Sequence, residues 1–218
     1  MARLGVVSVV QAIVNDLRDR IFTAELSPGT SLREVELAAH YEVARPTAKA
    51  ALENLVATGL LTRNAHQTAR VRRLTSEDVI DIYRTRAILE TEAVRILAAT
   101  CHAPSAASVA NDEITALQDA TPIQIVEPDI QFHRALIDAL DSPRVRTFYE
   151  QLTDDIRLCM AQVQDAILLS TERIATEHRR LLDLIAAGDA DSAVEHLERH
   201  LDNAGHRLAE HLVRDVLE

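Results

Sequence analysis

The chain is poor in the residues that form turns, aromatic cores and cross-links. Its 218 residues include five glycines, six prolines, two cysteines and no tryptophan, and aromatic residues make up 3%. So few turn formers favour helices over strands, and a core with few aromatics must be built from Leu, Ile, Val and Ala. Cys101 and Cys159 are far apart with no pairing pattern. We therefore expect a reduced, cytoplasmic protein.

A secretory signal and a membrane-spanning run are also missing from the sequence. No long apolar stretch with a small-residue cleavage site follows Met1. No segment approaches the roughly 18 consecutive apolar residues of a transmembrane helix. With 47% hydrophobic and 26% charged residues, the composition is typical of a globular protein, so no membrane partner is expected.

The net charge of −11 is divided unevenly along the chain. Residues 1–74 carry a net charge of +3, and residues 75–218 carry −14. The acidic balance argues against nucleic-acid binding over the whole surface, but a local basic region remains compatible with it. We predict two domains that meet after residue 74.

The first domain is predicted to contain three helices and a small β-hairpin. The expected helices are 7–24, 33–41 and 45–58, and the expected strands are 60–62 and 69–72. This order is typical of a winged helix-turn-helix. In the third helix, Arg45, Thr47 and Lys49 lie opposite the apolar face, where they could enter a DNA major groove. The alternative is a structural three-helix unit with a solvated basic face.

The second domain has a helical period almost throughout. The expected helices are 76–100, 105–119, 127–140, 143–169, 171–187 and 190–216. Thr75 to Asp78 form a helix-start signature, and Ser142 and Asp189 are expected caps. The predicted fold class is therefore mainly α, with the winged helix-turn-helix followed by an antiparallel bundle of six or seven helices.

Histidines and one aspartate recur at helical spacing in this second domain. Asp129 and His133 are four residues apart, as are His196 and His200, and His178 lies on the helix before the last. One carboxylate and several imidazoles from facing helices suit a divalent transition metal ion such as zinc, nickel, cobalt, iron or manganese. The alternative is that nine histidines produce such spacings by chance.

Residues 7–73 resemble the DNA-binding domain of GntR-family regulators. The likeness is carried by Ser27–Glu34, Val43–Leu52 and Leu55–Leu61. It implies that Arg45, Thr47 and Lys49 contact DNA, and the wing adds Arg70 and, at its tip, His66.

The chain departs from the GntR pattern at several positions. Ala44 replaces the usual Ser cap of the recognition helix, a loss of about 1 kcal/mol unless another group replaces it. Lys49 replaces an arginine, and Gln67 and Thr68 replace the Arg-Gly pair of the wing. These changes affect the DNA contacts and leave the fold pattern intact.

Residues 75–215 resemble the effector domain of FadR-type GntR regulators, the FCD domain. The likeness is carried by Asp129–Leu136, Glu177–Leu182, Ile185–Ala193 and His200–Leu201. In many members of this family four such positions hold one metal ion, here Asp129, His133, His178 and His200. His196 lies outside that pattern and is interpreted as a neighbour.

The same resemblance implies a small organic acid as the effector. Its carboxylate would complete the shell of the metal while an arginine pairs with it. Arg86 is the first candidate, and its alternative role is a salt bridge with Glu90, four residues on. Arg134 and Arg157 are further candidates with the same alternative.

Together these features predict a ligand-responsive transcriptional regulator and not an enzyme. The expected protein is a homodimeric repressor that binds double-stranded operator DNA and is released from it by the effector. One alternative is a metal sensor in which the ion is the signal. A less favoured alternative is a metal-dependent hydrolase, for which no further carboxylate or nucleophile stands at a recognisable spacing.

Overall fold

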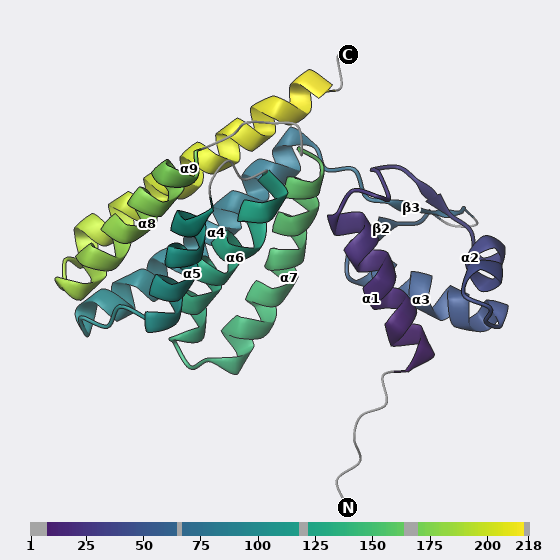
Figure 1. Cartoon of the computed structure of the whole chain (residues 1–218), viewed down its shortest axis with the longest axis horizontal. Helices are drawn as coiled ribbons and strands as arrows, with labels where there is room; N and C mark the ends of the chain where they lie inside the picture. Colours follow the sequence, from purple (N-terminus) through teal and green to yellow (C-terminus); the bar gives the residue numbers. More distant parts are fainter. Residues whose placement is uncertain (1–7, 65–66, 118–121, 164–169, 216–218) are drawn as a thin grey trace, which may run out of the picture. The chain divides into compact units, whose positions relative to one another are not determined.

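The computed structural model of the chain describes residues 8–64, 67–117, 122–163 and 170–215. The described part is mainly helical and divides into two compact units, Met1–Arg73 and Leu74–Glu218 (Figure 1). The predicted fold class, helices and a small sheet followed by a helical bundle, is confirmed. None of the helices in the described ranges is long and apolar enough to cross a membrane.

The first unit combines three helices with a small antiparallel sheet. Its elements are α1 (Val9–Phe22), β1 (Ser31–Leu32), α2 (Glu34–His40), α3 (Arg45–Ala57), β2 (Leu61–Thr62) and β3 (Ala69–Val71). The strands lie in the order β1-β3-β2. The hairpin was predicted, but β1 was not. A two-residue strand has no detectable period, and it exists because Thr30 and Gly29 exchange backbone hydrogen bonds with Val71.

Local sequence explains where the helices of this unit begin and end. The Ser8 hydroxyl accepts a hydrogen bond from the Gln11 N–H and caps α1. In α3 no side chain caps the start at Ala44, as its sequence predicts, while Pro46 occupies the first turn, where no N–H is needed. Gly59, with a φ of +81°, ends α3 in the left-handed conformation.

The second unit is a bundle of long helices. They are α4 (Ser76–Ala99), α5 (Ser105–Ala116), α6 (Pro122–Asp138), α7 (Pro143–Ala161), α8 (Thr171–Ala186) and α9 (Ala190–Asp215). Thr75 and Asp78 form a capping box at the start of α4. Ser142 and Asp189 each accept a backbone hydrogen bond three residues on, as predicted caps should.

Three helices of the bundle differ from their predicted bounds. α5 ends at Ala116, and residues 118–119 of the predicted helix 105–119 lie outside the described part. α6 begins at Pro122 and not at 127, so Pro128 lies inside it. Pro128 costs α6 one backbone hydrogen bond, since proline has no N–H. α7 ends at Ala161, and residues 164–169 of the predicted helix 143–169 lie outside the described part. The positions of the predicted ligands on these helices are unaffected.

The bundle is organised around the pair α4 and α9, which run side by side (Figure 1). Gly205 on α9 allows their close approach, because a Cβ atom there would lie 2.9 Å from Tyr83 Cβ on α4. Since Tyr83 Cβ is attached directly to the backbone, it cannot move aside without shifting α4. Gly205 therefore has a packing role that outweighs its poor helix propensity.

We expect Gly205→Ala to destabilise the helical unit by about 1–3 kcal/mol, the usual cost of overpacking. Glu210→Ala, at an exposed position of the same helix, serves as the control and should leave stability nearly unchanged. Urea denaturation followed by circular dichroism measures both. If Gly205→Ala stabilises the protein, as helix propensity alone would predict, the packing interpretation is wrong.

Candidate metal centre

Four of the predicted residues converge inside the helical bundle. Asp129 and His133 lie one turn apart on α6, His178 lies on α8 and His200 on α9. Each offers one ligand atom, and these atoms all lie within 4.8 Å of one another. The three histidines are buried, so the bundle encloses a polar cluster in an apolar interior.

The distances within the cluster are longer than hydrogen bonds. His178 Nε2 lies 3.5 Å from Asp129 Oδ1, and His133 Nε2 lies 3.9 Å from the same oxygen. The three imidazole centroids are 5.0–5.4 Å apart. Two ligand atoms of one zinc ion each lie about 2.0–2.2 Å from it, so they are at most about twice that distance apart. The two nitrogen–oxygen distances to Asp129 lie within that limit.

Several buried nitrogens of the cluster lack hydrogen bonds. Within the described residues, His133 Nε2 and both ring nitrogens of His178 have no hydrogen-bond partner. An unsatisfied buried polar group costs about 1–3 kcal/mol, so the arrangement needs an explanation. A divalent transition metal ion supplies one, since three imidazoles and a carboxylate form a suitable donor set. The residues therefore fit a metal ion.

Burial also selects the protonation state that metal binding requires. It lowers the pKa of His133, although the Glu90 charge opposes the shift. Burial lowers the pKa of His178 well below its usual value, with help from the neighbouring His200. Both rings are therefore held neutral, with a lone pair available to an ion. The His178 ring is fixed by Phe132, whose ring is parallel within 1° and 3.7 Å away.

Glu90 on α4 forms a second layer behind His133. This fully buried carboxylate accepts hydrogen bonds from Arg86 Nε at 2.9 Å, the Tyr149 hydroxyl at 2.7 Å and His133 Nδ1 at 2.6 Å. Burial raises the pKa of Glu90, but His133 and Arg86 outweigh it and hold the pKa well below its usual range. Glu90 is therefore an ionised carboxylate with a full set of donors.

Glu177 on α8 plays the corresponding part behind His200. Its carboxylate accepts hydrogen bonds from His200 Nδ1 at 2.7 Å and from Arg173 Nε at 2.9 Å. The hydrogen bond with His200, opposed by burial and assisted by Arg173, lowers the pKa of Glu177 to about 2. His196 Nε2 donates to the Glu177 backbone carbonyl at 2.8 Å, so His196 is a neighbour of the cluster, as the sequence indicated.

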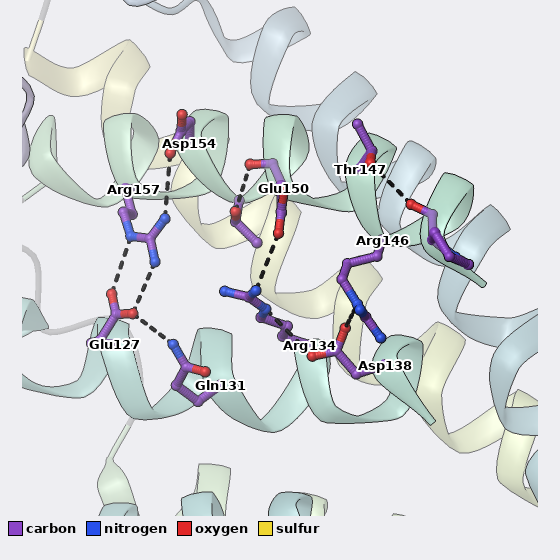
Figure 2. Close-up of polar contacts among 11 residues, drawn as sticks. Glu127, Gln131, Arg134, Asp138, Arg146, Thr147, Glu150, Asp154 and Arg157 are labelled. Carbon is purple, nitrogen blue, oxygen red and sulfur yellow. Dashed lines mark hydrogen bonds and ion pairs between the residues drawn. The ribbon is translucent and has the colours of Figure 1, made fainter. Parts of the chain in front are cut away.

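The three arginines predicted to bind an effector all have ion-pair partners. Arg86 is 2% exposed and forms the salt bridge with Glu90 that the sequence offered as its alternative role. Figure 2 shows the other two between α6 and α7: Arg134 pairs with Glu150, and Arg157 pairs with Glu127. An effector carboxylate would have to compete with these partners, so effector binding by these residues stays a prediction.

Sequence reasoning missed Glu177 and Tyr149, and it saw Glu90 only as a partner of Arg86. Glu177 directly precedes His178, and it does not lie three or four residues from any of the predicted ligands. Tyr149 lies 59 residues from Glu90. In the sequence, the four-residue spacing of Arg86 and Glu90 is the one signal that indicates a contact among the residues behind the histidines.

The predicted DNA-contacting residues lie on α3 and the wing of the first unit. Arg45 and Lys49 are exposed on α3, and Thr47 is half-buried. Arg70 on β3 is exposed, and its Nη1 donates to the Gly29 carbonyl at 3.0 Å. His66 lies outside the described residues.

Glu34 on α2 contacts two arginines of this first unit. It accepts hydrogen bonds from Arg63 Nη2 at 2.8 Å and from Arg45 Nε at 3.2 Å. These contacts, that with Arg63 above all, lower the pKa of Glu34. The carboxylate therefore pairs with Arg45 at the start of α3, a contact that the sequence did not predict.

Family models match both units of the chain. The model described as FCD domain matches residues 81–203. The model described as bacterial regulatory proteins, gntR family, matches residues 9–71. The two matches follow one another along the chain, in the order that the predicted domains have.

Two relatives and one solved structure are similar to this chain over most of its length. The HTH-type transcriptional regulator YdhC of Bacillus subtilis (strain 168) is 26% identical over 87% of this chain and 86% of its own length. The HTH-type transcriptional repressor NanR of Cronobacter sakazakii (strain ATCC BAA-894) is 26% identical over 88% of this chain and 82% of its own. The structure of a GntR transcriptional regulator from Rhodococcus sp. RHA1, 24% identical, covers 92% of this chain and 97% of its own with a TM-score of 0.79. The two relatives are named as transcriptional regulators, and the solved structure shares the fold of this chain.

The buried Arg86–Glu90 pair generates a stability prediction. Arg86→Met leaves the Glu90 charge buried and unpaired by the guanidinium, so we expect a loss of about 3–5 kcal/mol. The double variant Arg86→Met/Glu90→Gln removes both charges and should lose less than Arg86→Met alone. Urea denaturation of the metal-free proteins measures the difference.

The control for this prediction is Arg199→Met, which breaks the exposed pair with Glu195 and should leave stability nearly unchanged. If the double variant is less stable than Arg86→Met, the two charges do not compensate one another as described.

Proposed function

Because this chain belongs to the GntR family of transcriptional regulators that carry an FCD domain, we propose that it is a metal-dependent, effector-responsive repressor. The first unit would bind operator DNA. The FCD unit would hold a divalent transition metal ion and bind a small carboxylate beside it. Since bacterial operators lie in the cytoplasm, the protein would act there.

The observation that carries this proposal is the convergence of Asp129, His133, His178 and His200. These four residues would hold the ion, which would bind His133 Nε2 and one ring nitrogen of His178, buried atoms that have no hydrogen bond within the described part of the chain. When bound, such an ion supplies a positive site for an oxygen donor. The carboxylate class of effector is proposed because carboxylate oxygens suit that site and the neighbouring arginines.

The DNA-binding part of the proposal depends on α3. Arg45 and Lys49 are 67% and 54% exposed in the amino-terminal half of this helix. The helix N-terminus attracts DNA phosphates, and such side chains can bond to base edges. A dimer with two such helices would match a palindromic operator. The repressor assignment is supported by relatives such as NanR of Cronobacter sakazakii, whose name describes a transcriptional repressor.

Regulation requires that the effector bind the DNA-free state more tightly than the DNA-bound state. Arg86 is the proposed arginine partner of the effector, with Arg134 and Arg157 as further candidates. Because Arg86 already pairs with Glu90, an effector carboxylate that reaches Arg86 would have to displace part of the Glu90 contact. Effector binding and the arrangement around His133 would then be coupled.

Zinc binding tests the metal site. We expect the metal-free wild type to bind one Zn²⁺ per chain, and His200→Ala to lose most of that affinity because one ligand is missing. His206→Ala is the matched control on the same helix, with a ring that is 59% exposed, and should bind zinc like the wild type. Isothermal titration calorimetry measures all three proteins. Equal zinc affinity for His200→Ala and the wild type would rule out the proposed ligand set.

DNA binding tests the role of α3. On an operator fragment selected from random duplexes by the wild type, Arg45→Ala should weaken binding by about 1–3 kcal/mol, and Lys49→Ala should reduce the salt dependence. Arg95→Ala removes one exposed charge from the FCD unit and is the control. Fluorescence anisotropy at several salt concentrations measures the affinities. If Arg95→Ala loses as much as Arg45→Ala, α3 is not the reading helix.

A further inference from the structure

Two of the three histidines in the metal centre have a carboxylate at the ring nitrogen that faces away from the cluster. His133 Nδ1 lies 2.6 Å from Glu90 Oε2, and His200 Nδ1 lies 2.7 Å from Glu177 Oε2. The two contacts join different helices: α4 with α6, and α8 with α9. Two independent parts of the bundle therefore use the same arrangement.

We propose that Glu90 and Glu177 are positioning residues that determine which ring nitrogen His133 and His200 present to the metal ion. This inference rests on the metal site of the proposed function. Neither glutamate belongs to the ligand set, and each acts on the ion through its histidine.

The chemistry of imidazole explains how a glutamate would do this. A neutral imidazole carries one proton, on either Nδ1 or Nε2, and only the other nitrogen has a lone pair for a metal. An ionised carboxylate accepts hydrogen bonds and cannot donate them. Glu90 and Glu177 therefore keep the proton of each ring on Nδ1, which leaves Nε2 as the ligand atom. For His133, Nε2 is the buried atom that has no hydrogen bond within the described residues.

Each glutamate is itself held by an arginine, and Glu90 also by a tyrosine hydroxyl. Arg86 and the Tyr149 hydroxyl donate to Glu90 inside the bundle, where Glu90 is fully buried. Arg173 donates to Glu177, whose side chain is 21% exposed. Each carboxylate stays ionised and keeps its direction, so the histidine behind it has one orientation and one protonated nitrogen.

His178 provides a comparison within the same site. Neither of its ring nitrogens has a hydrogen bond among the residues that the structure describes. Its ring plane is set by stacking on Phe132 instead. Stacking orients the ring without choosing a protonated nitrogen. Of the three clustered histidines, His133 and His200 are therefore the two that we expect Glu90 and Glu177 to position.

The first experiment reads the protonated nitrogen directly. Nitrogen-15 NMR of the histidine rings in the metal-free wild type should find His133 and His200 protonated on Nδ1. In Glu177→Ala, His200 should lose this preference while His133 keeps it. A wild-type His200 protonated on Nε2 would overturn the proposal, and so would a His200 signal unchanged by Glu177→Ala. Because Glu177 is partly exposed, this variant avoids the folding problem of a buried charge.

The second experiment measures zinc affinity by competition with a chromogenic chelator. We expect Glu177→Ala to bind Zn²⁺ about 10- to 100-fold more weakly than the wild type, because loss of an outer partner has this effect. Glu177→Gln keeps an oxygen acceptor and should recover part of the loss. Glu172→Ala, an exposed position on the same helix, is the matched control and should bind zinc normally.

The results distinguish a failure of the positioning role of the glutamates from a failure of the metal site itself. Wild-type zinc affinity in Glu177→Ala would overturn the positioning role while leaving the four-residue site intact. Failure of the wild type to bind Zn²⁺, or of His200→Ala to weaken binding, would overturn the proposed function itself. Absorption spectra of the Co²⁺-loaded proteins add a structural readout, since a displaced His200 changes the ligand field, and an unchanged spectrum in Glu177→Ala would also count against the proposal.

Discussion

The cost of burying polar groups in an apolar helical bundle governs the second unit. Three histidines are buried, together with Glu90 and Arg86. Such groups are tolerated only when they are paired, hydrogen-bonded or bound to an ion. Glu90 meets this condition through three donors. The inward-facing nitrogens of His133 and His178 do not meet it through hydrogen bonds within the described residues, which is why the cluster is interpreted as a metal centre.

This constraint connects the parts of the unit into layers. The cluster of Asp129 and the three histidines forms the centre, the two glutamates lie behind two of the histidines, and Arg86 and Arg173 lie behind the glutamates. The layers alternate in charge, so each group has an opposite or neutral neighbour. An effector that pairs with Arg86 would therefore act on Glu90 and, through it, on His133. The bundle in this way offers a physical route by which an organic acid and a metal ion would affect one another.

In the first unit a carboxylate also pairs with arginines, here at the surface. Glu34 accepts hydrogen bonds from Arg63 and Arg45, so one carboxylate links α2 to the start of α3 and to the residue that follows β2. The uncapped start of α3 at Ala44 remains without a side-chain partner, but Pro46 reduces the number of N–H groups that need one. A reading helix with a weak cap is therefore compatible with a stable unit.

The sequence alone indicated most of the helices, the caps at Ser142 and Asp189, the change of charge near residue 74 and the four residues that the structure brings together. Helical period and cap chemistry are local, and the likeness to the FCD domain indicated which histidines belong together. Only the tertiary structure decided that Glu90 accepts a hydrogen bond from His133, 43 residues away. It also decided that Glu177 bonds to His200 and not to the adjacent His178. Such contacts depend on how helices are rotated and packed against one another, and no spacing within a single helix records that.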